Sequence, residues 1–140
     1  SPRLMPPQLE SFGLENTLES VIEQINNTGK IQVVLTTSNG LRQLEWPITL
    51  SLYRIIMELI NNTLKHAEAS KVTIDILVQN NMLICNYTDN GKGISANIAD
   101  KGLGHSGIYG RVNALNGTFE KGNREAGGFY ASINIPTILV

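Results

Sequence analysis

The longest run of helix-spaced hydrophobic residues extends from about residue 48 to residue 67. At 100° per residue, its apolar positions and one threonine fall on a single stripe that would face a core. The residues of this stripe are Ile48, Leu52, Ile55, Ile56, Leu59 and Thr63. The pattern therefore predicts an amphipathic helix that packs on the rest of the domain.

Polar residues of this predicted helix line the edge of its apolar stripe. Glu58 and Asn62 are four residues apart, and Lys65 and His66 follow on the next turn, so the four form one ridge. His66 is expected nearer the core face, whereas Asn61 points nearly opposite the stripe, toward solvent. The ridge is either a boundary row of solvated side chains or a functional site, and the helix alone leaves both readings open.

Hydrophobic periodicity in the rest of the chain predicts two further helices and five strands. The helices span residues 14–27 and 108–115, and the strands span residues 31–35, 72–78, 82–89, 118–121 and 129–135. Asn80-Asn81 lies between two strands and predicts a hairpin. Three helices and about five strands in this order predict an α+β fold, a two-layer α/β sandwich with a mixed sheet.

One carboxylate occupies an unusual position in this pattern. Leu83, Cys85, Tyr87 and Asp89 alternate along one strand and therefore share a face, the more apolar one. Asp89 ends the strand on the side that the covering layer would bury. A buried carboxylate is costly unless donors hydrogen-bond to it, so we expect Asp89 to have a specific task.

Composition excludes several classes of protein. At 140 residues the chain is long enough for one domain with its own core. A net charge of −1 provides no electrostatic footprint for nucleic acid or an anionic membrane. No apolar run approaches about 18 residues, so no membrane span is expected. Cys85 is the single cysteine, which excludes an internal disulfide and predicts an inert core thiol in a reducing compartment.

The segment from Gly102 to Gly107 has the literal pattern G-x-G-x-x-G, which also occurs in dinucleotide-binding folds. That fingerprint requires a strand immediately before it and an acidic residue that ends the next strand. Here a polar loop precedes the glycines, and Glu120 and Glu125 are poorly placed. The context argues against a dinucleotide-binding site of that kind.

Three segments together are much more specific than any one of them. They are Glu58-x-x-x-Asn62-x-x-Lys65-His66, Asp89-x-Gly91-x-Gly93 and Gly102-x-Gly104-x-x-Gly107. In this order and at these separations they resemble the N box and the two glycine boxes of the GHKL ATPases. That superfamily includes DNA gyrase, the ninety-kilodalton heat-shock chaperone, sensor histidine kinases and the MutL repair protein.

Within the superfamily the chain is most similar to the catalytic and ATP-binding (HATPase_c) domain of bacterial two-component sensor histidine kinases. The short interval from Gly93 to Gly102 resembles the short-lid group of nitrate/nitrite sensors. Residues 1–13 resemble the linker from the dimerisation and phosphoacceptor domain, and residues 14–140 resemble the ATP-binding domain. The resemblance implies a Bergerat-type sandwich, with one face of the sheet covered by three helices.

The resemblance also implies how the base would be read. Asp89 would accept the exocyclic amino group of adenine and reject guanine, whose carbonyl oxygen would face an acceptor. With few other partners, Asp89 would depend on the base. Gly91 and Gly93 would bring the backbone close to the base with unusual dihedral angles, and Ile94 belongs to the same nucleotide-binding set.

Other matching residues would handle the phosphates. Asn62 would supply the one protein oxygen to Mg²⁺, and Glu58 would orient or deprotonate the attacking group. Lys65 would neutralise phosphate charge, and His66 would either do the same or simply pack and cap. In the second glycine box, Gly102 and Gly104 would act as hinges, and Leu103 between them belongs to the same nucleotide-binding set. The backbone N–H groups of His105, Ser106 and Gly107 would bind the phosphates.

One position departs from the family pattern. The last strand of such kinases commonly begins with Gly-Thr, and the threonine lies near adenine through water. Here Phe129 follows Gly128, so Tyr130 and Ser132 are the candidate replacements.

The implied function is to bind Mg-ATP and donate its γ-phosphate to a histidine outside this chain, because neither His66 nor His105 has a helical phosphoacceptor context. Implied partners are the dimerisation helices of the parent kinase and a downstream response regulator. The domain would be cytoplasmic, without membrane or nucleic-acid contact of its own, in a parent attached to the inner membrane. The alternatives are an anti-sigma-factor-type serine kinase of the same superfamily and a non-catalytic ATP-binding regulatory domain.

Overall fold

The structure is a computed structural model and describes residues 7–93 and 105–137. In chain order its elements are α1 (Pro7–Asn26), β1 (Gln32–Thr37), the 3₁₀ turn η1 (Leu41–Gln43), α2 (Trp46–His66), β2 (Lys71–Gln79), β3 (Met82–Asp89), α4 (His105–Ala114), β4 (Thr118–Asn123) and β5 (Phe129–Pro136).

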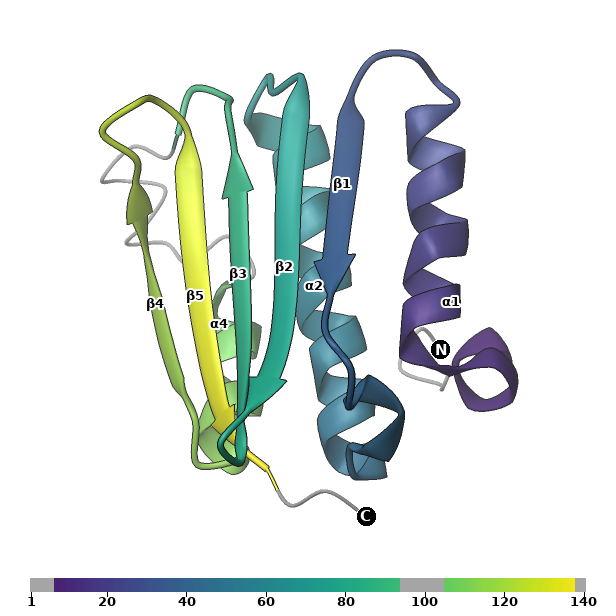
Figure 1. Cartoon of the computed structure of the whole chain (residues 1–140). Coiled ribbons are helices and arrows are strands. Elements are labelled where there is room, and N and C mark those ends of the chain that lie inside the picture. The colour runs from purple at the N-terminus through teal and green to yellow at the C-terminus, as the bar shows by residue number, and fades with distance from the viewer. Residues whose placement is uncertain (1–6, 94–104, 138–140) are drawn as a thin grey trace.

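The five strands form one mixed sheet in the order β1-β2-β3-β5-β4 (Figure 1). β1 and β2 are parallel, and the other three neighbouring pairs are antiparallel. The β2–β3 hairpin turns at Asn80 and Asn81, which both have positive φ angles, 54° and 60°. Asparagine tolerates this left-handed region better than most residues, so the predicted hairpin is confirmed together with the mixed sheet.

The helices cover one face of the sheet and leave the other open (Figure 1). The predicted stripe of α2 is buried against the strands, and Leu52, Ile55 and Ile56 have no exposed surface. Burial of each such side chain contributes about 1.5–3 kcal/mol. The two-layer sandwich predicted from the periodicity is therefore confirmed. Within the described residues, no helix is long and apolar enough to cross a membrane.

The helices begin earlier than the periodicity predicts. α1 starts at Pro7 rather than residue 14, although Gly13 interrupts it with φ 84° and ψ 172°. Leu9 is only 1% exposed, so this one residue of the predicted linker packs on the core, whereas the other residues from 7 to 12 are exposed. α2 starts at Trp46, two residues before the predicted boundary, because Pro47 is tolerated in a first turn, where its missing N–H has no helical partner.

Cys85 is buried, as predicted for an inert core thiol. Burial, and then the negative charge of Asp75, raise the pKa of its thiol to about 12. The reactive thiolate is therefore scarce near neutral pH.

Candidate functional site

The polar ridge of α2 divides into a half-buried and an exposed part. Glu58 and Asn62 are half-buried, whereas Asn61 is exposed, so the predicted register of the helix is confirmed. Lys65 and His66 are exposed. The expectation that His66 lies nearer the core is wrong, because the buried stripe continues from Thr63 to Ala67, and His66 falls beside it.

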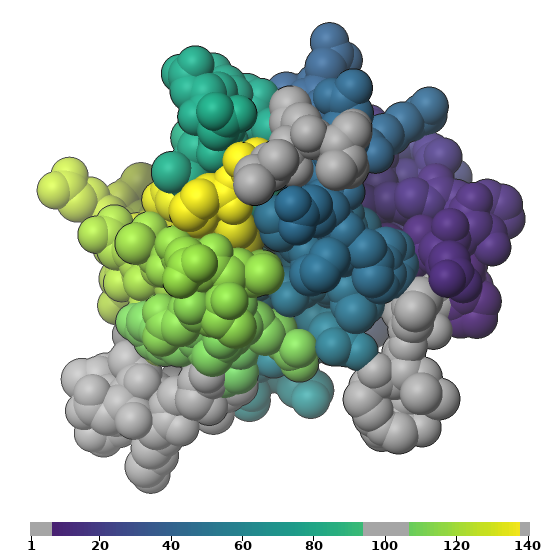
Figure 2. Space-filling model, turned by 90° about the horizontal axis from the view of Figure 1, so that it is seen from below, coloured from purple at the N-terminus to yellow at the C-terminus, as the bar shows by residue number. Residues whose placement is uncertain are grey.

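Helix α4 packs beside α2 (Figure 2). Gly107, in its first turn, faces the carboxylate: a Cβ added there would lie 3.4 Å from Glu58 Oε1 and 3.6 Å from Oε2. Arg111 is one turn further along α4. Within the described part of the chain, Glu58 Oε2, Asn62 Nδ2 and Arg111 Nε are buried without a hydrogen-bond partner. Buried polar atoms are normally paired, so these three groups are suited to meeting a ligand.

Electrostatics at Glu58 has two opposing causes. Burial raises the pKa of its carboxyl group above the ordinary value of 4.5, and the positive charge of Arg111 lowers it. A carboxylate that loses hydration while it retains a cationic neighbour is typical of acid–base sites. Sequence reasoning missed Arg111, and its position one turn after Gly107 was the only available signal.

Asp89 is buried at the end of β3, with 2% of its surface exposed. Its Oδ2 accepts a hydrogen bond from Thr63 Oγ1 at 3.0 Å. Its Oδ1 accepts from the backbone N–H of Gly91 at 2.9 Å and of Phe129 at 3.3 Å. The predicted need for donors is confirmed. The expectation of few partners is wrong, because three separate segments converge on this carboxylate.

The turn after Asp89 is fastened to the end of α2. The backbone N–H of Lys92 donates to the carbonyl of Ala67 at 2.8 Å. A Cβ at Gly91 would lie 2.2 Å from that carbonyl oxygen, so only glycine fits. Gly93 has the predicted unusual backbone, with φ 76°. Gly91 does not have a positive φ, and it lies close to the backbone of Ala67. The expectation that Gly91 is needed for unusual dihedral angles is therefore wrong, and the reason for glycine here is close packing against protein backbone.

The start of β5 closes the other side of Asp89. Gly128 has φ 102°, and a Cβ there would lie 1.9 Å from the carbonyl oxygen of Asp89. Arg124 Nη1 donates to the same carbonyl at 2.9 Å. These contacts join residues far apart in the sequence, and sequence reasoning missed Thr63 and Arg124 as partners of Asp89.

The two proposed substitutes for the family threonine lie on the wrong face. Phe129 is buried on the helix side of β5, whereas half-buried Tyr130 pairs with Thr88 across the strands and shares the open face of the sheet. Ser132 has the same alternation as Tyr130. Neither side chain reaches the face of Asp89, so the expectation of a replacement by Tyr130 or Ser132 is wrong.

Some predicted site residues lie outside the described residues, namely Ile94, Gly102, Leu103 and Gly104. α4 begins at His105, as expected for a glycine box that opens a helix. The backbone of His105 and Ser106 belongs to that first turn.

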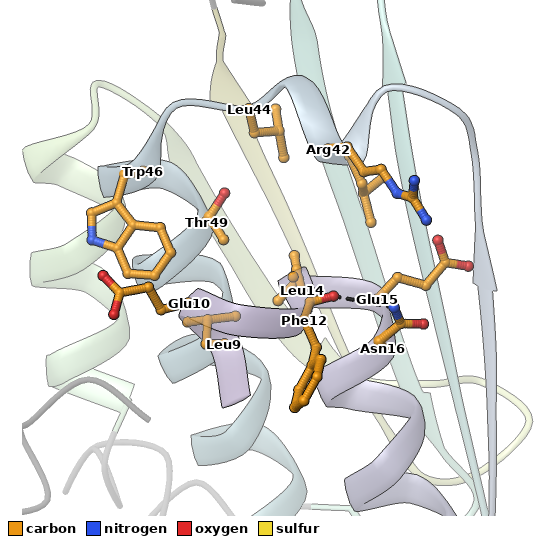
Figure 3. A pocket seen from close by; sticks show the side chains of 12 residues that line it. Leu9, Glu10, Phe12, Leu14, Glu15, Asn16, Arg42, Leu44, Trp46 and Thr49 are labelled. Atoms are coloured by element: carbon orange, nitrogen blue, oxygen red, sulfur yellow. Dashed lines mark hydrogen bonds between the residues drawn. The ribbon is translucent and has the colours of Figure 1, made fainter. Parts of the chain in front are cut away.

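The described residues contain no group of three or more His, Cys, Asp or Glu that could hold a metal ion. A separate hollow of about 180 Å³ lies between α1, η1 and the start of α2, lined by residues that include Phe12, Arg42 and Trp46 (Figure 3). It contains none of the α2 ridge residues and not Asp89, so it is not part of the candidate site.

Residues 48–138 match the family of histidine kinase-, DNA gyrase B- and HSP90-like ATPases. The chain is 32% identical over 135 residues to the sensor histidine kinase ComP of Bacillus subtilis (strain 168), covering 94% of this chain and 18% of ComP. It is 28% identical over 141 residues to the histidine-protein kinase/phosphatase DegS of the same strain, covering 96% of this chain and 37% of DegS. The chain thus spans well under half the length of these relatives.

Solved structures share the fold. The catalytic domain of the histidine kinase ThkA has a TM-score of 0.71 at 18% identity, covering 88% of this chain and 89% of that one. The blue-light activated histidine kinase of Erythrobacter litoralis has a TM-score of 0.69 at 20% identity, covering 88% of this chain and 41% of that one. At these identities the likeness concerns the fold. The family match covers most of the chain and shows that it belongs to the histidine kinase-, DNA gyrase B- and HSP90-like ATPases, and the curated relatives that it resembles are histidine kinases.

Proposed function

We propose that this domain binds Mg-ATP with Asp89 on the base and the α2 ridge on the phosphates, and donates the γ-phosphate to a histidine outside this chain. The observation that carries the proposal is the connection between the two ends of the site. Asp89 is hydrogen-bonded to Thr63, the residue that follows Asn62 on α2. A base reader and a phosphate-handling turn are therefore held in one rigid unit.

Asp89 has the acceptor capacity that adenine needs. A carboxylate has about four lone-pair positions, and in Asp89 three of them accept hydrogen bonds from donors of the protein. The remaining capacity suits the exocyclic amino group of adenine. Guanine would present a carbonyl oxygen there, which repels an acceptor and leaves it unpaired.

Asn62 fits the proposed magnesium site. Mg²⁺ commonly takes one or two protein oxygens and fills its shell with water and substrate phosphates, which agrees with the lack of a cluster of metal-ligating side chains in the described residues. Asn62 Oδ1 would be the ligand of the ion, and Nδ2, which is buried without a hydrogen-bond partner, would donate to a phosphate oxygen. Mg²⁺ bound at Asn62 would neutralise part of the phosphate charge. Exposed Lys65 and His66 would add positive charge, and the backbone of residues 105–107 would donate to phosphate oxygens.

Glu58 is proposed to orient the attacking group and accept its proton. The group it would serve is the acceptor imidazole or, in slow hydrolysis, a water molecule. Positioning of the reactants supplies most of the rate enhancement in phosphoryl transfer. A carboxylate fixed beside the γ-phosphate would therefore be enough to orient the attacking group. Gly107 leaves space in front of this carboxylate.

The partners follow from this division of labour. Dimerisation helices of the same kinase would bring the acceptor histidine, with residues 1–13 as the linker to them, and a response regulator would take the phosphoryl group onward. We propose a cytoplasmic site for these steps, in a parent attached to the inner membrane.

The test uses the purified chain together with the dimerisation helices of its own full-length kinase. With labelled ATP, we expect an acid-labile phosphohistidine on the helices and no label on this chain. Glu58→Gln should suppress the label and leave ATP affinity, measured by calorimetry, within about threefold. Phosphate on His66 or His105, or on a serine of another protein, would refute the two-part kinase and favour the anti-sigma alternative.

A further inference from the structure

A buried chain of hydrogen bonds extends from Asp89 into the core. Thr63 Oγ1 donates to Asp89 Oδ2 at 3.0 Å and lies 2.5 Å from the hydroxyl oxygen of Tyr87. The Tyr87 hydroxyl in turn donates to the carbonyl of Leu59 at 3.1 Å. Tyr87 has no exposed surface, and Thr63 is 5% exposed. We call these two hydroxyl groups the Thr63–Tyr87 relay.

We propose that the Thr63–Tyr87 relay fixes the acceptor geometry of Asp89 and thereby sets the preference for an amino-substituted purine over one that carries a carbonyl group. The inference rests on the proposed role of Asp89 as the base reader. Thr63 and Tyr87 act through Asp89 and are therefore positioning residues rather than base contacts.

The direction of the relay follows from counting hydrogens. An ionised carboxylate only accepts, so Thr63 must donate its single hydroxyl hydrogen to Asp89. Thr63 can then only accept from Tyr87, whose one hydrogen is shared between Thr63 and the carbonyl of Leu59. Two hydroxyl hydrogens thus serve three contacts, and the Tyr87 hydrogen is divided between Thr63, on the path to Asp89, and the carbonyl of Leu59. Aligned hydrogen bonds of this kind strengthen one another in a low-dielectric interior.

The surrounding packing holds the relay in place. Tyr87 and Asp89 are two residues apart on the same face of β3, and α2 carries Thr63 above the gap between them. The ring of Phe129 packs edge-on against Tyr87, with centroids 6.3 Å apart. Burial raises the pKa of the Tyr87 hydroxyl, so it stays a donor throughout the physiological range.

Loss of either hydroxyl changes what Asp89 can accept. Without the Thr63 hydrogen, Oδ2 has no donor from the protein, and the carboxylate can rotate toward other donors. An acceptor with a free orientation discriminates less between a base that donates at this point and one that does not. The relay therefore affects selectivity, which a purely structural role would not change.

The test measures ATP and GTP affinity of the purified chain by calorimetry, with folding checked by circular dichroism and thermal melting. Thr63→Val keeps the shape and removes the hydroxyl, and Tyr87→Phe removes the second one. Each should weaken ATP binding about tenfold and reduce the ratio of ATP to GTP affinity. Thr63→Ser keeps the hydroxyl group, so its ATP affinity and its ratio of ATP to GTP affinity should equal those of the wild type.

Two controls separate this inference from the proposed function. Thr88→Val lies on the same strand but on the open face, and should change neither value. Asp89→Asn should abolish ATP binding, and retained binding would overturn the base reader and the relay together. If Asp89→Asn loses ATP while folded Thr63→Val or Tyr87→Phe keeps the wild-type ATP to GTP ratio, the relay is wrong and the proposed function stands. If one of the two variants, Thr63→Val or Tyr87→Phe, unfolds, the ratio of ATP to GTP affinity of the other variant decides whether the relay is right.

Discussion

Gly107 on α4 faces the carboxylate of Glu58 on α2, so closely that an added Cβ would lie 3.4 Å from Glu58 Oε1. This is ordinary contact distance, and α4 would accommodate the methyl group without a shift. The methyl group would nevertheless occupy the space in front of the carboxylate. We therefore expect glycine to serve here by leaving Glu58 accessible rather than by its backbone freedom.

Gly107→Ala should separate stability from activity. Alanine has a higher helix propensity than glycine, so the unfolding free energy should be unchanged or rise by about 0.5–1 kcal/mol. Transfer of phosphate to the dimerisation helices should fall by about tenfold or more, because the methyl group displaces the attacking group. Chemical denaturation and a phosphotransfer assay measure the two effects.

Gly110→Ala is the matched control for this prediction. It lies in the same helix, and a Cβ there would meet nothing within 4 Å. It should stabilise the helix similarly and leave phosphotransfer intact. Equal losses of activity in the two variants would contradict the role given to the space at Gly107.

Glu58→Gln should stabilise the domain at neutral pH. Burial raises the pKa of Glu58 above 4.5, so the folded state binds this proton more tightly than the unfolded chain does. The contribution of Glu58 to stability is therefore complete below about pH 4.5 and is lost as the pH rises through the folded pKa. The neutral amide cannot ionise and avoids that loss.

Urea denaturation at pH 4 and pH 7 tests this difference. The variant should exceed the wild type in unfolding free energy at pH 7 by more than it does at pH 4. Arg111→Gln should have the opposite effect at pH 7, because it removes the charge that lowers the pKa of Glu58. A Glu58→Gln effect that is the same at both pH values would show that burial does not perturb this carboxyl group.

Asn62→Ala and Asn61→Ala should differ sharply although the residues are adjacent. Asn62 is half-buried with an unpaired amide nitrogen, whereas Asn61 is exposed. We expect Asn62→Ala to abolish the Mg²⁺ dependence of ATP binding. Asn61→Ala should change stability by no more than about 0.5 kcal/mol and leave that dependence intact. Calorimetry with and without Mg²⁺ decides, and equal effects of the two substitutions would exclude Asn62 as the metal ligand.

Local periodicity was sufficient for much of the fold. The β2–β3 hairpin was predicted with its turn at Asn80-Asn81, because strand alternation and turn residues act over a few positions. The same local rules placed Asp89 on the buried face and Asn61 in solvent. They were less successful at helix starts, where Pro7 and Pro47 permitted an earlier beginning than the apolar spacing indicated.

The sequence by itself determined the elements, the buried face of each, and the three motifs that resemble the ATPase family, since these depend on spacing along one segment. Only the tertiary structure decided what surrounds Asp89, because its donors come from residues up to 40 positions away. It also decided that Gly91 packs against Ala67 and that His66 is exposed, since both depend on where α2 ends over the sheet. A helical wheel shows which side of a helix is apolar, but the docking of the layers determines how far that side is covered.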